Sequence, residues 1–309
     1  NMQAARLSRF GGTASVTVMD VEKPAVAPGK VLVEVHAAGV NPWDWKITKG
    51  GVEFPLPITV GGDFAGIVSE VGPGVTGFKK GDEVFGQASP FNGGSGSFAD
   101  FDLADAKATA LKPERFNFVE AGALPLAGVS ALQALLDHIK LAKGQKILIH
   151  GGAGGIGTFA VQIAKYTGAF VATTVGTEDI DYVKSLGADV AIDYKKQRFE
   201  DLVSDYDAVF DTVAGETYKR SFGVLKKNGI IVSMNEKPDK ELMSRYDVMA
   251  VGQGTRVTTE RLNALRKLVD QGAVSVHVEK VFPLHSAAEA LAYLEGGHAR
   301  GKIVVEIKA

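Results

Sequence analysis

The sequence predicts an α/β protein in which a barrel or curled sheet of short strands is interrupted by a doubly wound parallel sheet. Three observations support this prediction. Short alternating segments fill the first third of the chain, strands then alternate with helices, and strand patterns return in the tail. We therefore expect residues 1–122 and 258–309 to form one domain, and residues 123–257 to form a second domain inserted into it.

Strands are expected throughout the N-terminal part. Alternating and β-branched residues lie between proline and glycine turns there, and a glycine- and serine-rich loop is expected at 89–97. The segments with strand character are "VTVMDV" (16–21), "KVLVEVHAAGV" (30–40), "ITVGGDFAGIVSEVGPGV" (58–75), "DEVFGQ" (82–87) and "FADFDL" (98–103).

The pattern changes to helix at Phe118, and this alanine- and leucine-rich helix ends before Gly144. About six strands then form the parallel sheet, at 146–150, 169–175, 189–193, 207–213, 229–234 and 247–251. The helices expected between them lie at 157–167, 179–186 and 216–227. The tail adds a helix at 259–270, a strand at 274–282, a helix opened by a capping box of Ser286 and Glu289, and a strand at 302–308.

Composition limits the function classes. The 309 residues include 34 Lys and Arg against 36 Asp and Glu, with a formal net charge of -2 and no long basic run, so we expect neither nucleic acid nor a membrane as partner. No signal-peptide pattern and no apolar stretch of about 18 residues is present, which favours a cytoplasmic protein. The expected partner is a small molecule.

No metal site is expected. The chain has no cysteine, which removes disulfides, thiolate nucleophiles and sulfur-ligated zinc. None of the six histidines stands at i, i+4 spacing from another, so structural or surface roles explain them better: His36, His138, His150, His277, His285 and His298.

A glycine-rich loop follows the strand at 146–150 and opens the next helix. Gly152, Gly154 and Gly157 fit the G-x-G-x-x-G pattern, in which glycines allow a tight turn, close approach to a pyrophosphate and helix packing on the strand. The lysine of an ATP or GTP loop is missing, because Thr158 follows Gly157 directly. The pattern predicts a dinucleotide site of the Rossmann type, with a merely connecting glycine turn as the alternative.

The next strand bears on the choice of dinucleotide. It ends in Thr173, Thr174 and Val175, with no carboxylate to accept a ribose 2'-hydroxyl, which favours NADPH. Glu178 and Asp179 follow closely, and their charges oppose a 2'-phosphate. We therefore expect a modest preference for NADPH.

Motifs along essentially the whole chain resemble one family. They are "AAGVNPWDWKITKG", "VGGDFAGIVSEVG", "GDEVFG", "GSFADF", "LPLAGVSALQAL", "GGAGGIGTFAVQIAK", "LGADVAIDY", "VFDTVAG" and "ARGKIVV". The sequence resembles the zinc-independent quinone oxidoreductases of the medium-chain dehydrogenase/reductases, and within them the alkenal/enone reductases. The resemblance implies a GroES-like β-barrel catalytic domain interrupted by a Rossmann domain, NADPH in the cleft between them, and a homodimer.

Two departures from the patterns of related enzymes argue against a zinc alcohol dehydrogenase and against a 2-enoyl-thioester reductase. Gly62 stands where zinc alcohol dehydrogenases of this fold place a zinc-binding histidine, and 88–97 is too short for their four-cysteine lobe. The chain also lacks the tyrosine that many relatives place a few residues after the Asn-Pro motif as a possible proton donor, since Val52 stands roughly where the 2-enoyl-thioester reductases place theirs and the first tyrosine is Tyr166.

The resemblance implies a set of site residues. Asn41 would line the nicotinamide pocket and Lys46 would reach the cofactor, and these two are the candidate catalytic residues. A turn role before Pro42 and a solvated lysine are the alternatives. The other expected cofactor contacts are Gly152, Gly154, Gly155, Ile156 and Gly157 at the pyrophosphate, Thr173, Thr174, Gly176, Thr177 and Tyr194 at the adenosine end, and Val213 and Ser233 at strand ends, where ordinary packing is the alternative.

These observations predict an NADPH-dependent, metal-free reductase of quinones or α,β-unsaturated carbonyls, in which the cofactor supplies the hydride. A 2-enoyl-thioester reductase is the alternative within the enzymes. A catalytically silent NADP(H)-binding sensor or structural protein is the alternative from another class.

Overall fold

The computed structural model describes residues 1–297 and 299–309, so His298 lies outside the described residues. The chain forms two compact units. Unit 1 contains Asn1–Val129, Val257–Gly272 and Val276–Ala309, and unit 2 contains Ser130–Arg256 and Ala273–Ser275. The units thus divide after Val129 and after Arg256, whereas the domain limits expected from the sequence lie at 122/123 and 257/258.

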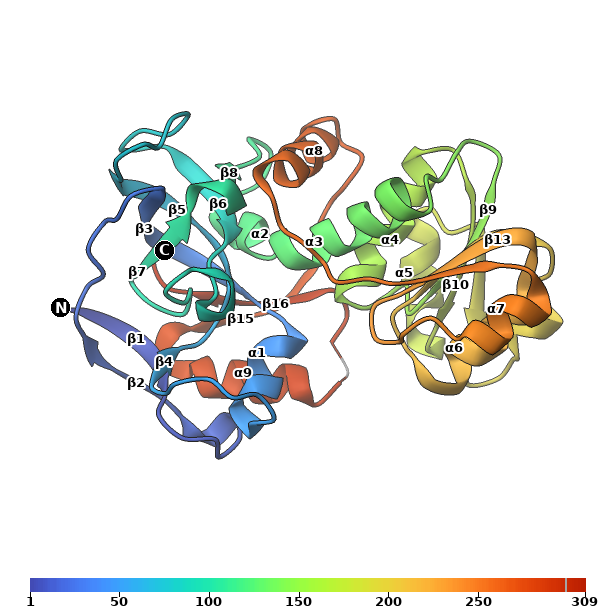
Figure 1. The fold of residues 1–309 in the computed structure, drawn as a ribbon, viewed down its shortest axis with the longest axis horizontal. Helices are drawn as coiled ribbons and strands as arrows, with labels where there is room; N and C mark the ends of the chain where they lie inside the picture. The colour runs from blue at the N-terminus through green and yellow to red at the C-terminus, as the bar shows by residue number, and fades with distance from the viewer. Residues whose placement is uncertain (298) are drawn as a thin grey trace. The chain divides into compact units, whose positions relative to one another are not determined.

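Unit 1 is built from two sheets (Figure 1). The smaller sheet has the order β2-β1-β4, and the larger has the order β15-β16-β3-β5-β6-β8 with β7 also paired to β3. The strands are β1 (Met2–Leu7), β2 (Val16–Val21), β3 (Lys30–Val40), β4 (Ile58–Thr59), β5 (Asp63–Val71), β6 (Glu83–Gln87), β7 (Phe101–Asp105), β8 (Thr109–Leu111), β15 (Val278–Pro283) and β16 (Lys302–Glu306).

The tail returns to this unit because β16 pairs antiparallel with the end of β3, with Ile303 opposite Val40. Helix α9 (Ala287–Glu295) buries Ala287 and Leu291 in the same core as Leu7 of β1. The pairing places the first residue of β16, Lys302, beside the end of β3. The other helices of unit 1 are α1 (Pro42–Lys46), α2 (Phe118–Gly122) and α8 (Thr259–Asp270), and the division between the units falls within α3 (Pro125–Leu132).

Unit 2 is a six-stranded parallel sheet with the order β11-β10-β9-β12-β13-β14, the doubly wound arrangement (Figure 1). Its strands are β9 (Lys146–His150), β10 (Phe170–Val175), β11 (Val190–Asp193), β12 (Tyr206–Asp211), β13 (Leu225–Ser233) and β14 (Met249–Gly252). Its helices are α4 (Gly155–Tyr166), α5 (Ile180–Ser185), α6 (Gly215–Ser221) and α7 (Lys240–Tyr246). The predicted fold class is confirmed.

The helix expected at 216–227 is wrong at its C-terminal end. Helix α6 stops at Ser221, a 3-10 turn follows, and β13 begins at Leu225. Leu225 pairs with Tyr206 of β12, and the ammonium of Lys226 forms an ion pair with Asp207. Pairing with the neighbouring strand therefore outweighs the local preference of these residues for helix.

Two other expectations need correction. The long helix from Phe118 is divided into α2, α3 and a π-helical turn at Gln133–His138, and α3 begins at Pro125, whose missing N–H suits a helix start. The capping box at Ser286 does not form, because a 3-10 turn ends at Ser286 and its side chain makes no capping hydrogen bond to α9.

Within residues 1–297 and 299–309, no helix is both long and apolar enough to cross a membrane.

Candidate functional site

Asn41 lies at the junction of β3 and α1 in unit 1. Its backbone N–H donates to Oδ2 of Asp44 over 2.8 Å, and the N–H of Asp44 donates back to the Asn41 carbonyl over 2.9 Å. Pro42 fits the first position of the helix because it has no N–H to leave without a partner. The start of α1 thus fixes the backbone of Asn41, and its side chain is held by other residues.

Two buried charged residues hold the Asn41 amide. Lys302 Nζ donates to Asn41 Oδ1 over 2.7 Å and to the Val40 carbonyl over 3.1 Å. Asn41 Nδ2 donates to Asp63 Oδ2 over 2.9 Å, and the N–H of Leu126 donates to the same carboxylate over 3.1 Å. Strands β3, β5 and β16 therefore fix the orientation of one amide.

Burial perturbs the ionisation of this group. Desolvation raises the pKa of Asp44 to about 7 and the pKa of Asp63 to about 6. The attraction of Lys302 and the hydrogen bond from Asn41 oppose the rise at Asp63. Desolvation also lowers the pKa of Lys302, against the attraction of both carboxylates. Perturbed ionisation next to a cavity is typical of functional sites.

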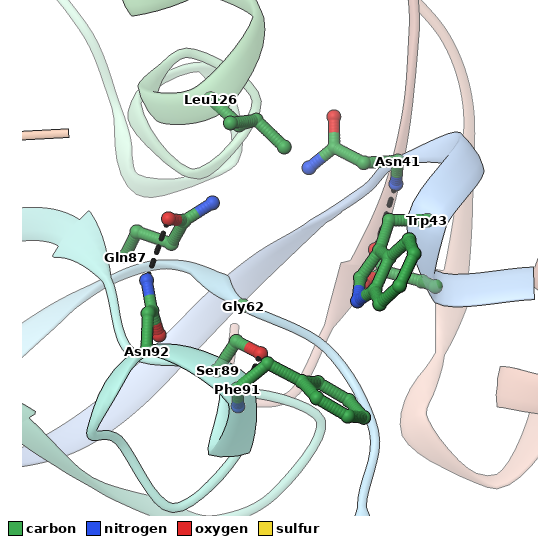
Figure 2. A pocket seen from close by; sticks show the side chains of 9 residues that line it. Asn41, Trp43, Gly62, Gln87, Ser89, Phe91, Asn92 and Leu126 are labelled. Carbon is green, nitrogen blue, oxygen red and sulfur yellow. Dashed lines mark hydrogen bonds between the residues drawn. The ribbon is translucent and has the colours of Figure 1, made fainter. Parts of the chain in front are cut away.

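A cavity of about 120 Å³ opens beside the Asn41 side chain (Figure 2). Trp43 and Phe91 face each other across one side of it, edge to face, with ring centroids 5.6 Å apart. Gln87 accepts a 2.6 Å hydrogen bond from Asn92 on another side. The full lining is Asn41, Trp43, Asp44, Gly62, Gln87, Ser89, Phe91, Asn92 and Leu126. The cavity therefore offers flat aromatic surface together with amide groups.

Lys46, the second candidate catalytic residue, is not part of this lining. It is exposed at the C-terminal end of α1, and its Nζ lies 5.7 Å from the centroid of the Trp45 ring. The structure therefore does not bring Asn41 and Lys46 together in the cavity of unit 1.

In unit 2, the glycine loop joins β9 to α4 as the motif predicts. A Cβ on Gly157 would meet the Gly151 carbonyl oxygen at 1.9 Å, so only glycine fits where the helix starts. A Cβ on Gly152 would meet Oγ1 of Thr173 at 2.2 Å. At Gly154, by contrast, the nearest such contact is 3.4 Å. Gly155 and Ile156 begin α4, whose N-terminus supplies unpaired N–H groups. This arrangement fits a pyrophosphate.

The expected adenosine-end residues fall into two sets. Thr173 and Thr174 are buried, and the Thr173 hydroxyl donates to the Ile149 carbonyl over 2.6 Å. Thr177 and Tyr194 are exposed at the ends of β10 and β11, with Thr177 donating to Asp193 over 2.6 Å. Gly176 is buried between the two sets. The hydroxyls of Thr177 and Tyr194 are therefore accessible to a ligand. The buried Thr173 and Thr174 instead bond to the backbone of β9 and the glycine loop.

Charged side chains surround this exposed set. Lys195 Nζ lies 3.4 Å from Glu178 Oε2, and both side chains are exposed. The N–H of Lys195 donates to Asp193, whose pKa is lowered by the hydrogen bond from Thr177. Glu178, which the sequence analysis placed near a 2'-phosphate, is thus paired with Lys195, a residue that the sequence analysis did not single out.

Val213 and Ser233 meet at one buried carboxylate. Asp211 accepts from the Ser233 hydroxyl over 2.7 Å, from the Val213 N–H over 2.9 Å and from the Ala214 N–H over 3.0 Å. Ser233 is fully buried and ends β13, whereas the Val213 side chain is 53% exposed. The Val213 side chain is therefore accessible to a ligand beside the glycine loop. Ser233 is buried and holds the Asp211 carboxylate that accepts from the Val213 N–H.

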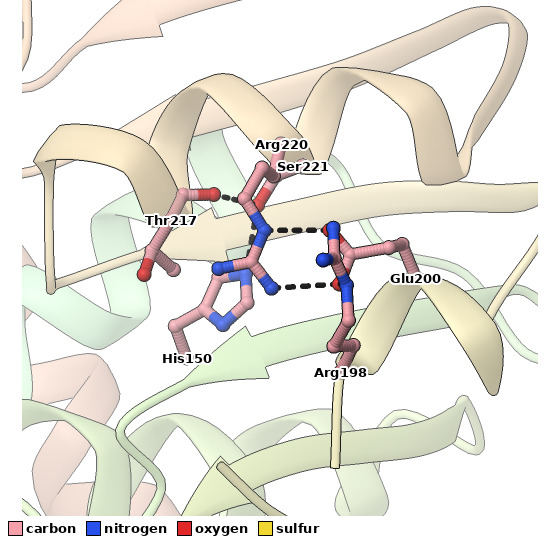
Figure 3. Close-up of polar contacts among 6 residues, drawn as sticks. All are labelled: His150, Arg198, Glu200, Thr217, Arg220 and Ser221. Atoms are coloured by element: carbon pink, nitrogen blue, oxygen red, sulfur yellow. Dashed lines mark hydrogen bonds and ion pairs between the residues drawn. The ribbon is translucent and has the colours of Figure 1, made fainter. Parts of the chain in front are cut away.

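His150 is buried at the end of β9, just before the glycine loop, and Figure 3 shows it beside Ser221 of α6. The Ser221 hydroxyl donates to the Thr217 carbonyl, so His150 Nε2–H donates to Ser221 over 2.8 Å. Nδ1 then accepts from Thr174 over 3.0 Å, and Thr174 Oγ1 accepts in turn from the Gly151 N–H over 3.2 Å. This chain of hydrogen bonds requires neutral His150.

Sequence reasoning missed Asp44, Asp63, Gln87 and Lys302. Each stands inside a quoted motif or strand segment, but its role depends on contacts between distant strands. A signal was present: Asp63 precedes an apolar strand and Lys302 begins one, and a charged residue bordering a buried strand needs a partner.

Comparison with known proteins decides the family. A family model described as alcohol dehydrogenase GroES-like domain matches residues 27–114, and one described as zinc-binding dehydrogenase matches residues 186–305. An Arabidopsis thaliana protein named NADPH-dependent alkenal/one oxidoreductase, chloroplastic, is 36% identical over 98% of this chain and 79% of its own length. The chain belongs to the medium-chain dehydrogenase/reductase superfamily.

Within this superfamily the chain falls in the quinone oxidoreductase and alkenal reductase branch, as the motifs predicted. The quinone oxidoreductase of Coxiella burnetii superposes with a TM-score of 0.91 at 33% identity, over 99% of each chain. The Escherichia coli quinone oxidoreductase complexed with NADPH superposes with a TM-score of 0.89 at 25% identity, over 99% of this chain and 100% of that chain. The chain is therefore an oxidoreductase of the medium-chain superfamily.

The zinc of some medium-chain dehydrogenases does not fit these residues. A Cβ on Gly62 would meet Cβ of Ser89 at 3.1 Å and Cγ of Gln87 at 3.4 Å, which leaves little room for a histidine. Among the described residues, no group of three or more His, Cys, Asp or Glu side chains is placed to hold a metal ion.

Proposed function

We propose that this protein reduces quinones or α,β-unsaturated carbonyl compounds with NADPH and without a metal ion. The cavity of unit 1 carries the proposal, because it combines the Asn41 amide with the aromatic faces of Trp43 and Phe91. A planar, conjugated carbonyl compound matches this combination. The names of the relatives, an alkenal/one oxidoreductase and quinone oxidoreductases, support the same substrate class.

The glycine loop fits the diphosphate of a dinucleotide. Bound NADPH would supply the hydride. We assign the pyrophosphate to Gly152, Gly154, Gly155, Ile156 and Gly157, the adenosine end to Thr173, Thr174, Gly176, Thr177 and Tyr194, and the remaining cofactor contacts to Lys46, Val213 and Ser233. In this proposal Thr173, Thr174 and Ser233 shape the cofactor site from within the protein, since their hydroxyls already bond to protein groups.

Asn41 orients and activates the substrate carbonyl. An amide has two N–H donors, and Asp63 takes one from Asn41 Nδ2 while Lys302 fixes the amide oxygen. The second N–H donates to the carbonyl oxygen, on which negative charge develops during reduction. One such donor contributes about 2.7 to 4 kcal/mol to the stability of an oxyanion. Asn41→Ala should therefore lower kcat by about 100- to 1000-fold.

NADPH is favoured over NADH at the exposed end of β11. The side chains of Tyr194, Lys195 and Lys196 follow this strand in sequence, and Lys195 already compensates the nearby carboxylate of Glu178. A 2'-phosphate would gain hydrogen bonds and cations there. The preference is modest, because Glu178 competes for Lys195.

The test measures NADPH oxidation with a simple quinone, a short enone and a crotonyl thioester. Turnover of the quinone or enone, well above the thioester and unchanged after chelation, is the expected result. Preference for the thioester would favour the enoyl-thioester reductase. Tight NADPH binding without turnover of any acceptor would favour a cofactor-binding sensor, and loss of turnover on chelation would refute the metal-free reaction.

Two further properties belong to the proposal. We expect a homodimer, which light scattering of the purified protein tests directly. We also expect a cytoplasmic protein, although the Arabidopsis relative is chloroplastic, and fractionation of the source cells decides this.

A further inference from the structure

Two carboxylates and one ammonium are buried together beside the cavity. Asp44 is 5% exposed, Asp63 0% and Lys302 3%, and each comes from a different element of unit 1. If all three were ionised, the group would carry one uncompensated negative charge away from water. Such a charge is costly, and a buried group of this kind lowers its energy by holding a proton.

The hydrogen bonds show which carboxylate stays ionised. Asp63 accepts from Asn41 Nδ2 and from the Leu126 N–H, and the nearby Gln87 side chain also lowers its pKa. Among the described residues, Asp44 accepts only from the N–H of Asn41. A carboxylate with several donors keeps its charge more easily than one with a single donor. The ammonium of Lys302 and these donors therefore hold Asp63 ionised, which leaves the proton for Asp44.

Within residues 1–297 and 299–309, the surroundings of Asp44 supply no other compensating charge. On its own segment, Lys46 is exposed beside Trp45, and Lys49 is paired with Glu295 of α9, the helix packed against α1. The charges acting on Asp44 itself are those of Asp63 and Lys302. Asp44 is also one of the residues that line the cavity in which we place the substrate.

We propose that Asp44 holds one proton near neutral pH and donates it to the substrate during reduction. This rests on the proposed function. In an enone, hydride addition forms a C–H bond at the β-carbon and moves the C=C electrons to an enolate. The O–H bond of Asp44 then breaks, its proton bonds to the α-carbon, and Asp44 is left as a carboxylate that regains a proton from water. A quinone takes up the same hydride and proton to give the hydroquinone.

Burial supports this role through acidity. Desolvation and the neighbouring charge of Asp63 raise the pKa of Asp44 to about 7, above the pKa of about 6 for Asp63. An acid of this strength donates and recovers a proton readily near neutral pH. Residues 1–122 contain no tyrosine, and none of the described residues that line the cavity is a tyrosine, which leaves this task to another group.

The decisive variant is Asp44→Asn, whose amide oxygen can still accept from the N–H of Asn41. We expect wild-type kcat to fall about tenfold per pH unit above the pKa of Asp44, because only the protonated acid donates. Asp44→Asn should lower kcat by about 100-fold or more near pH 6 and remove this dependence. Asp102→Asn is the matched control: Asp102 is equally buried in unit 1, bonds to Ser95 and does not line the cavity, so the pH dependence should be retained.

A second measurement does not depend on turnover. Carbon NMR of the cofactor-free protein, labelled at aspartate carboxyl groups, should show one carboxyl that titrates near pH 7 and is missing in Asp44→Asn. A carboxyl of Asp44 already ionised at about pH 5 would overturn the proposal, as would a wild-type kcat that stays flat between about pH 6 and pH 8. Failure of the wild type to reduce any quinone or enone would instead refute the proposed function, and the donor role with it, while leaving the measured titration standing.

Discussion

Lys302 donates a 2.7 Å hydrogen bond to Oδ1 of Asn41, although 261 residues separate the two in the chain. The bond exists because β16 pairs with β3 and brings the two ends together. It fixes which way the amide points, since an oxygen held by an ammonium leaves the nitrogen to face Asp63 and the cavity. The tail of the chain thus sets the orientation of the residue that we assign to substrate activation.

Replacing Lys302 with Met should destabilise the fold strongly. The change leaves the ionised carboxylate of Asp63 buried without its counter-charge, and breaking a buried pair in this way costs about 3 to 5 kcal/mol. Denaturant unfolding at neutral pH measures the loss. Lys308→Met is the matched control, because Lys308 is 57% exposed in its pair with Glu34 and should cost about 1 kcal/mol or less. Equal losses in the two variants would contradict the account of the buried group.

Gly154 and Gly157 should respond differently to alanine. At Gly157 the added Cβ would meet the Gly151 carbonyl at 1.9 Å, so Gly157→Ala should lower both the free energy of unfolding and cofactor affinity. At Gly154 the nearest such contact is 3.4 Å, so Gly154→Ala should fold normally and lose affinity only through its approach to the pyrophosphate. Calorimetric NADPH binding and thermal unfolding of both variants separate the effects. Unchanged affinity in Gly154→Ala would place the pyrophosphate elsewhere.

Neutralising Glu178 should increase the preference for NADPH. Its carboxylate lies 3.4 Å from Lys195 Nζ, and Glu178→Gln would free this ammonium for a 2'-phosphate. Asp179→Asn should add a smaller gain, while Lys195→Met should lower NADPH affinity and leave NADH affinity unchanged. Calorimetry with both cofactors, at fixed ionic strength because these charges are exposed, provides the comparison. Tighter binding of NADH than of NADPH by the wild type would show that the carboxylates prevail.

The parallel sheet and its glycine loop could be predicted from the sequence because their signals are local. Strand, loop and helix follow one another between 146 and 167, and the alternation of strands with helices predicts the doubly wound parallel sheet. The start of β13 at Leu225 could not be predicted in this way. Its residues favour a helix locally, and their partners in β12 stand nearly 20 residues earlier.

The buried charged group shows the same limit in the candidate site. Asn41 and the glycines were found because their motifs are contiguous, whereas Asp63 and Lys302 meet only after β5 and β16 pair with β3. Their types were visible in the sequence, but not their distances of a few ångström from Asn41. Register between strands, which is fixed by the whole pattern of buried side chains, decides such contacts.

His150 should make unfolding depend on pH between 6.5 and 4. Burial lowers its pKa from 6.5 to about 4, so the folded protein keeps His150 neutral where the unfolded chain becomes protonated. Stability is therefore fully present above pH 6.5 and is lost as the pH falls toward 4, by about 3 kcal/mol. Protonation would also prevent Nδ1 from accepting the Thr174 hydroxyl that holds the Gly151 N–H.

Unfolding of His150→Asn by denaturant at a series of pH values tests this dependence. The variant should be less stable than wild type at neutral pH and should lose much less stability between pH 6.5 and 4. His285→Asn, which changes an exposed histidine, should behave as wild type. The ion pair of Arg220 with Glu200 acts in a lower window, because the hydrogen bonds from Arg220 lower the pKa of Glu200 from 4.5 to about 2 (Figure 3). Its contribution is complete above pH 4.5 and is lost toward pH 2. If His150→Asn kept the full wild-type loss between pH 6.5 and 4, the acid sensitivity would have to come from other groups.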